Sequence, residues 1–102
     1  MSLTDMIASA CAATPDFASG HVWLAGAGPG HPRYLTLEVA DALAKCDCVV
    51  YDALVSAEVL ALAGTAELHF AGKRGGKPSA TQESITAMLI ELARAGRRVV
   101  RL

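Results

Sequence analysis

Three short segments of the 102-residue chain carry residue types that could do chemistry. Residues 26–31 read GAGPGH, Asp52 follows the apolar run CVVY, and Lys73 follows the run ELHFAG. Glycine lets a backbone approach a ligand closely, and a proline between two glycines stiffens the loop, so Gly28 and Pro29 are candidate ligand-binding residues. Asp52 supplies a carboxylate that could accept a proton, and Lys73 opens a basic loop.

Each of these segments also has a purely structural interpretation. The loop at 26–31 reads equally well as a tight turn that binds nothing, and Asp52 as a turn or cap residue before ALVS. Lys73, together with Arg74 and Lys77, reads as a solvated basic loop. The residues taken alone leave both sets of interpretations open.

The elements that must position these segments alternate between strand and helix. Apolar runs predict strands at 21–26, 48–52, 67–72 and 97–102. Apolar residues at helical spacing predict helices that begin at Pro32, at Ser56 and at a capping box formed by Ser79 and Gln82. The order βαβαβαβ predicts a three-layer α/β domain with a mainly parallel sheet, because a helix of this length returns the chain to the same side. Ligands bind at the carboxyl ends of such strands, so we expect Pro29, Asp52 and Lys73 on one rim.

Composition and charge restrict the partners. Hydrophobic residues make up 53% and charged residues 19% of the chain, and the formal net charge is −1, which indicates neither a nucleic-acid nor a membrane partner. Three cysteines without a framework spacing are typical of reduced thiols in a cytoplasmic protein. Residues 1–20 have no signal-peptide pattern and are expected to form a flexible extension, with at most one or two loose helical turns around MIASACAA.

A dinucleotide-binding oxidoreductase is the obvious alternative. Gly26 and Gly28 follow a predicted strand, and Asp52 ends the next one, where a ribose-binding acid would lie. Two residues count against this class. His31 occupies the position of the third glycine, and Pro29 has no N–H group to offer a phosphate oxygen.

Three stretches together resemble a known family. VWLAGAGPGHPRYLTL, ADALAKCDCVVYDALVS and FAGKRGGKPSATQESI are similar, in this order and spacing, to the tetrapyrrole methylases, and in particular to members that methylate uroporphyrinogen III. The resemblance runs from about residue 21 to residue 102. It departs from the usual family pattern at His31, where many members have Asp, and at Ala53, where many have Arg.

The resemblance implies methyl transfer from S-adenosylmethionine to carbons of uroporphyrinogen III, giving precorrin-2 and S-adenosylhomocysteine. It places Pro29, with Gly28 beside it, at the family's donor-binding loop, Asp52 at its proposed proton acceptor and Lys73 at its proposed proton donor. Ala53 is similar to the form in cobalamin-making enzymes, so the pathway could be cobalamin rather than siroheme synthesis.

The resemblance also has consequences for domain organisation. Family members are usually homodimers that hold the donor between two α/β domains, and the stretch from 21 to 102 is similar to the N-terminal one only. We therefore expect the C-terminal domain to be absent from this chain and the chain alone to be inactive. A third class stays open, a non-catalytic α/β module that pairs with another chain through the surface left uncovered.

Overall fold

The computed structural model describes residues 1–13, 15–72 and 81–102. Its elements in chain order are α1 (Leu3–Ala12), β1 (Val22–Leu24), the 3₁₀ helix η1 (Pro32–Tyr34), α2 (Leu37–Lys45), β2 (Cys48–Tyr51), α3 (Ala57–Ala61), β3 (Glu67–Phe70), α4 (Gln82–Arg94) and β4 (Val99–Arg101). In these residues, no helix is both long and apolar enough to cross a bilayer.

The four strands form one parallel sheet in the order β1-β4-β2-β3. β4 lies between β1 and β2, with Val22 opposite Val99 on one side and Cys48 opposite Val99 on the other. β3 pairs with the outer side of β2, with Cys48 opposite Glu67. The predicted alternation and the parallel sheet are therefore confirmed, and the last strand in sequence is a central one in space.

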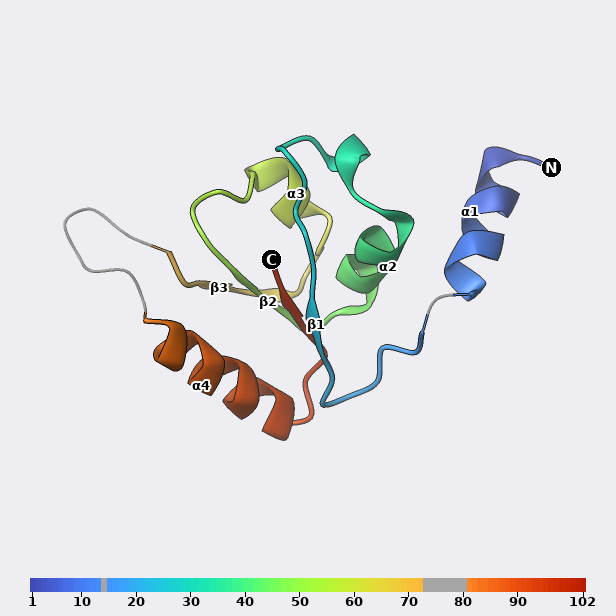
Figure 1. The fold of residues 1–102 in the computed structure, drawn as a ribbon. Helices are drawn as coiled ribbons and strands as arrows, with labels where there is room; N and C mark the ends of the chain where they lie inside the picture. The colour runs from blue at the N-terminus through green and yellow to red at the C-terminus, as the bar shows by residue number, and fades with distance from the viewer. Residues whose placement is uncertain (14, 73–80) are drawn as a thin grey trace.

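Helices cover both faces of the sheet, so the three predicted layers are present. Figure 1 shows α4 on one side and α2 and α3 on the other. Toward α2 and α3 the core is formed by residues such as Leu43, Val49, Val59 and Val100, and toward α4 by residues such as Val50 and Ile85. Alternate residues of β2 point to opposite faces, and both faces are apolar because both are covered.

Two predicted helix starts are wrong. Pro32 begins the short helix η1, and α2 begins only at Leu37, where the Thr36 side chain accepts a hydrogen bond from the Val39 N–H at 3.2 Å. Gln82 is the first residue of α4, whose N-cap is Thr81, so Gln82 cannot be the third residue of a capping box. Ser79 lies outside the described residues. In both cases a threonine next to the helix caps it instead.

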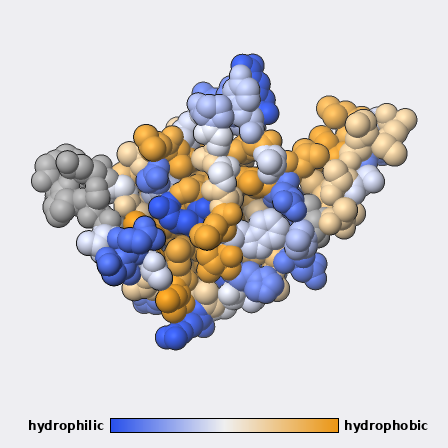
Figure 2. Space-filling view, in the orientation of Figure 1, coloured by the Kyte–Doolittle hydropathy of each residue, from blue (hydrophilic) through white to orange (hydrophobic). Residues whose placement is uncertain are grey.

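The N-terminal segment has more structure than the sequence indicated. α1 is a ten-residue helix with a capping box made by Ser2 and Asp5, and Figure 1 shows it projecting beyond α2. Its apolar side chains are exposed, and Figure 2 shows hydrophobic atoms on this projection. Phe17 is only 7% exposed and stacks on Trp23, with ring centroids 5.1 Å apart. The core of the domain therefore includes a residue from the stretch expected to be an extension.

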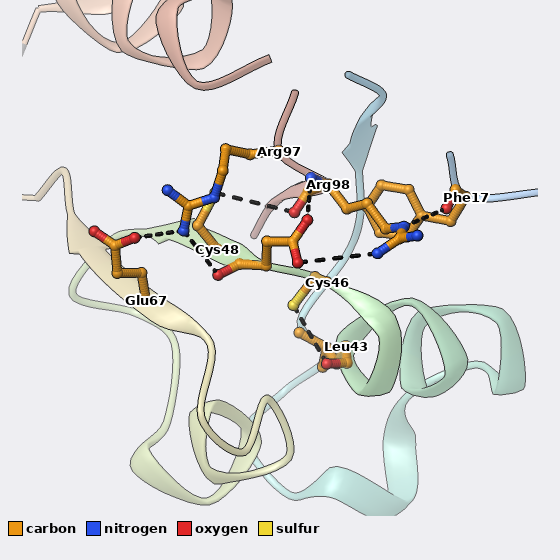
Figure 3. Close-up of polar contacts among 8 residues, drawn as sticks. Phe17, Leu43, Cys46, Cys48, Glu67, Arg97 and Arg98 are labelled. Carbon is orange, nitrogen blue, oxygen red and sulfur yellow. Dashed lines mark hydrogen bonds and ion pairs between the residues drawn. The ribbon is translucent and has the colours of Figure 1, made fainter. Parts of the chain in front are cut away.

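A polar cluster closes the amino-terminal edge of the sheet (Figure 3). The Arg97 guanidinium pairs with the Glu67 carboxylate and also donates to the carbonyl of Asp47 at 3.4 Å. The Arg98 Nε donates to the carbonyl of Phe17 at 2.9 Å, and the Arg98 N–H donates to the Asp47 carboxylate at 2.8 Å. These contacts hold the N-terminal segment and the start of β2 against the start of β4.

Candidate functional site

The candidate site lies at the carboxyl-terminal edge of the sheet. Since β1, β2 and β3 are mutually parallel in one sheet, the segments that follow them emerge at the same edge. These segments are residues 25–31, 52–56 and 71–72, which we call the first, second and third rim loops. The first contains Gly28 and Pro29 and the second contains Asp52, so three of the four predicted site residues are at this edge. Lys73, with Arg74 and Lys77, lies outside the described residues.

The first rim loop depends on glycine at defined positions. Gly28 has φ of +69° and Gly30 has φ of +131°, both in a region that side chains rarely adopt. A Cβ on Gly28 would also lie 3.3 Å from the Cβ and carbonyl oxygen of Tyr34. Pro29 between them is exposed. The loop thus presents a stiff corner to the solvent, as the sequence predicted.

Open space lies beside this loop. A Cβ built on Gly26 or on Gly30 would meet no atom within 4 Å among the described residues. A ligand can therefore approach the backbone closely on either side of Pro29, which is what a flat or bulky group placed on this loop requires. The residues present fit a bound adenosyl group in this respect.

Asp52 begins the second rim loop and is partly buried. Its Oδ1 accepts a hydrogen bond from the Leu54 N–H at 2.9 Å, and its carbonyl accepts one from Val55 N–H at 3.3 Å. The turn role that the sequence allowed is therefore present. It occupies one carboxylate oxygen, and within the described part of the chain Oδ2 has no hydrogen-bond partner. That oxygen can accept a proton without breaking the turn.

The second rim loop contacts both of the others. Ser56 Oγ donates to the Gly30 carbonyl oxygen at 2.5 Å, which joins the first loop to the second. Figure 1 shows the loop after β1 passing beside the start of α3. Gly72 in the third loop lies so close to the second that a Cβ on it would be 2.8 Å from the Ala53 backbone nitrogen. The second loop therefore connects the three segments that were predicted to share this edge.

These contacts were not predicted. The sequence indicated Ser56 as the N-cap of a helix, which is confirmed, because its Oγ accepts from the Val59 N–H at 3.2 Å. The same oxygen's contact with Gly30 joins residues 26 positions apart, and no local pattern signals it. For Gly72, the signal was present as a glycine directly after a strand, which is typical of a close backbone approach.

Ion pairs and cavities add little at this edge. His31 Nε2 is 4.0 Å from the Glu58 carboxylate, with both side chains more than half exposed, so the pair contributes little. A cavity of about 580 Å³ lies instead at the opposite edge, lined by Asp47, Thr65 and Arg97 among others. Among residues 1–13, 15–72 and 81–102, no group of three or more His, Cys, Asp or Glu side chains could hold a metal ion.

Two thiols outside the rim are held in the protonated form. Burial raises the pKa of the Cys46 thiol to about 11, and Cys46 Sγ donates to the Leu43 carbonyl at 3.3 Å. Burial also raises the pKa of Cys48, which is fully enclosed. Thiols in this state are poor nucleophiles and metal ligands, which favours a structural role for both residues.

The fold and the loops at the carboxyl-terminal edge of the sheet indicate the class of protein to which the chain belongs. The family model described as Tetrapyrrole (Corrin/Porphyrin) Methylases matches residues 21–102. The chain therefore belongs to the tetrapyrrole methylases.

Individual relatives show which members of the family the chain is similar to. The chain is 55% identical over 98 residues to a uroporphyrinogen-III C-methyltransferase of Sinorhizobium sp, a match that covers 95% of this chain and 35% of the relative. It is 46% identical over 84 residues to a siroheme synthase of Acinetobacter baylyi, covering 81% of this chain and 18% of that protein. The chain thus spans about a third of the length of the C-methyltransferases that it matches.

Solved structures agree with the sequence relatives. The crystal structure of a Thermus thermophilus uroporphyrin-III C-methyl transferase complexed with S-adenyl homocysteine superimposes with a TM-score of 0.67 at 44% identity, covering 80% of this chain and 34% of that one. The likeness to methylases does not favour the oxidoreductase alternative.

Proposed function

We propose that this chain is the N-terminal α/β domain of an S-adenosylmethionine-dependent uroporphyrinogen-III C-methyltransferase that forms precorrin-2. The observation that carries the proposal is the 55% identity to a C-methyltransferase, which extends over nearly the whole chain. The joined rim loops supply a physical site that suits this chemistry.

The rim residues have separate roles in the proposed reaction. S-adenosylmethionine supplies an electrophilic methyl group, which is transferred from sulfur to a pyrrole carbon while S-adenosylhomocysteine leaves. Gly28 and Pro29 form the corner against which the donor is held, and alignment of donor and acceptor is the main task left to the protein. Carbon methylation makes the macrocycle cationic, so a proton must leave it, and Asp52 Oδ2 accepts that proton.

Lys73 has a different proposed role. The acetate and propionate groups of uroporphyrinogen III are anionic, and an ammonium group directly after the third rim loop can bind one of them or return a proton to the ring. Residues 73–80 are outside the described part, so this role is supported by the sequence resemblance and by the position of Gly72 at the rim.

The complete enzyme would have further features. We infer a cytoplasmic homodimer in which a C-terminal domain covers the rim and completes the donor site. Relatives named uroporphyrinogen-III C-methyltransferase and siroheme synthase both match the chain, so the product could enter cobalamin or siroheme synthesis.

Ligand binding and turnover of the complete enzyme test this proposal. Calorimetry should show binding of S-adenosylhomocysteine and none of NADH. Labelled methyl groups should appear in the tetrapyrrole, and Asp52→Asn should abolish turnover without abolishing S-adenosylhomocysteine binding. Binding of NADH alone would overturn the proposal in favour of the oxidoreductase class, and pairing with another chain without either ligand would favour a non-catalytic module. The 102-residue chain by itself should show no turnover.

A further inference from the structure

Ser56 makes two hydrogen bonds with one hydroxyl group. Its oxygen accepts from the Val59 N–H at 3.2 Å, which caps α3, and its proton is donated to the Gly30 carbonyl oxygen at 2.5 Å. The side chain is partly buried between the two loops that it joins. A hydroxyl has only one proton, so the bond to Gly30 takes up its whole donor capacity.

This bond sets the spacing between the two rim loops that carry the proposed site. Gly30 directly follows Pro29, and Ser56 is four positions after Asp52, so the hydroxyl connects the donor corner to the segment that holds the carboxylate. Gly30 has φ of +131°, a conformation that glycine adopts without strain, so the backbone of Gly30 does not by itself fix the loop and an added hydrogen bond can restrict it. An ion pair between His31 of the first loop and Glu58 of α3 is 4.0 Å long and exposed, so it adds little to this connection.

We propose that Ser56 is the positioning residue for the methyl donor: its hydroxyl holds the Pro29 corner in the conformation that binds the donor, at a fixed distance from Asp52. The inference rests on the proposed function above. Ser56 does not touch the reacting atoms, so its loss weakens donor binding and leaves proton transfer at Asp52 in place.

Three substitutions separate positioning from helix capping. Ser56→Asp keeps a good N-cap acceptor but has no proton for Gly30, whereas Ser56→Thr keeps both functions of the hydroxyl. Thr36→Ala is the matched control, because Thr36 caps α2 through the Val39 N–H and has no bond to a rim loop. Each is made in the complete enzyme, with affinity for S-adenosylhomocysteine measured by calorimetry and the Gly30 carbonyl resonance measured by NMR.

We expect Ser56→Asp to weaken S-adenosylhomocysteine binding and to raise the KM for the donor by about tenfold, the effect of one well-placed hydrogen bond, with kcat little changed. Ser56→Thr should restore affinity to within about twofold of the wild type, and Thr36→Ala should lower the melting temperature without changing affinity. The Gly30 carbonyl resonance should move in Ser56→Asp alone.

The outcomes are distinct. Wild-type affinity in Ser56→Asp, or an equal loss in Thr36→Ala, would overturn the inference and leave the proposed function standing. If the wild-type enzyme itself fails to bind S-adenosylhomocysteine, the proposed function fails, and the donor-positioning role fails with it. An unmoved Gly30 resonance in Ser56→Asp would overturn the loop contact itself, whatever the ligand.

Discussion

Gly72 provides a direct test of the contact between the second and third rim loops. The residue follows β3, and its backbone lies against the start of the loop that contains Asp52. A Cβ at this position would be 2.8 Å from the Ala53 backbone nitrogen and 2.9 Å from Phe70 Cζ. The φ angle of Gly72 is not in the left-handed region, so the penalty of Gly72→Ala is a steric one.

The expected loss of stability in Gly72→Ala follows from the atoms that the new Cβ would displace. Ordinary contact begins at 3.4 Å, so about 0.6 Å of displacement is needed, against a backbone atom on one side and a ring on the other. The Phe70 ring cannot retreat freely because it packs edge-on against Tyr51, with centroids 5.4 Å apart. Overpacking of this kind costs about 1–3 kcal/mol, and the entropy gain of Gly→Ala offsets part of it. We expect a net loss of about 1–2 kcal/mol.

Gly26→Ala is the matched control, because Gly26 also follows a strand at the rim, has no left-handed φ, and would place its Cβ in open space. Chemical denaturation of the 102-residue chain should show Gly72→Ala less stable than wild type by about 1–2 kcal/mol, with a melting temperature at least about 4 °C lower. Gly26→Ala should be unchanged or slightly more stable. Equal stability of the two variants would refute the close approach of the rim loops.

Three further predictions concern the core and the opposite edge. Leu43→Ala, at a fully buried position of α2, should cost about 2–5 kcal/mol in chemical denaturation, and a loss below about 1 kcal/mol would contradict its place in the core. The Arg97 hydrogen bond lowers the pKa of Glu67 in the folded chain. Near the ordinary pKa of a glutamate the folded chain therefore binds fewer protons than the unfolded chain. The stabilisation by this pair is present above the ordinary pKa and is lost as the pH falls through the lowered pKa of the folded chain. Glu67→Gln should therefore flatten the acid limb of a stability–pH curve, and an unchanged limb would argue against the pair. Cys46 is partly buried, and this burial raises its pKa to about 11, so it should react slowly with iodoacetamide at pH 8 in the folded chain and faster after denaturation, as measured at this residue by mass spectrometry; equal rates in the two states would contradict the raised pKa.

The sequence was sufficient to predict the layers and the edge of the sheet at which Pro29 and Asp52 lie. Short, β-branched apolar runs such as 48–52 favour strands covered on both faces, and strands separated by helices of this length are expected to be parallel. The shared edge of Pro29 and Asp52 follows from that geometry alone. The N-cap role of Ser56 was also predictable, because capping involves residues three positions apart.

Other features depend on contacts that sequence spacing does not encode. Strand order placed β4 between β1 and β2, and nothing in the run 97–102 distinguishes a central strand from an edge one. Phe17 was assigned to an extension because its neighbours are small and polar, yet it is buried by Trp23 and fixed by Arg98 through its carbonyl. Pro32 was a good helix start by local rules, but a 3₁₀ turn and a second cap at Thr36 precede α2.

The side chains at the two edges of the sheet have different roles, and this difference explains which residues the sequence predicted. At the amino-terminal edge, Arg97 and Arg98 are bound to Glu67, Asp47 and the N-terminal segment, so their charges are used to hold the fold together. At the carboxyl-terminal edge, within the described residues, the first two loops are joined by the Ser56 hydroxyl, Pro29 is exposed, and one oxygen of Asp52 has no hydrogen-bond partner. A site for a reacting ligand needs such uncommitted groups on a rigid frame, and the frame here comes from close backbone contacts. Sequence motifs identify groups such as Pro29 and Asp52, because the chemistry of a site restricts the residue types that can serve in it. The contacts that position these groups join residues far apart in the sequence, so only the structure shows them.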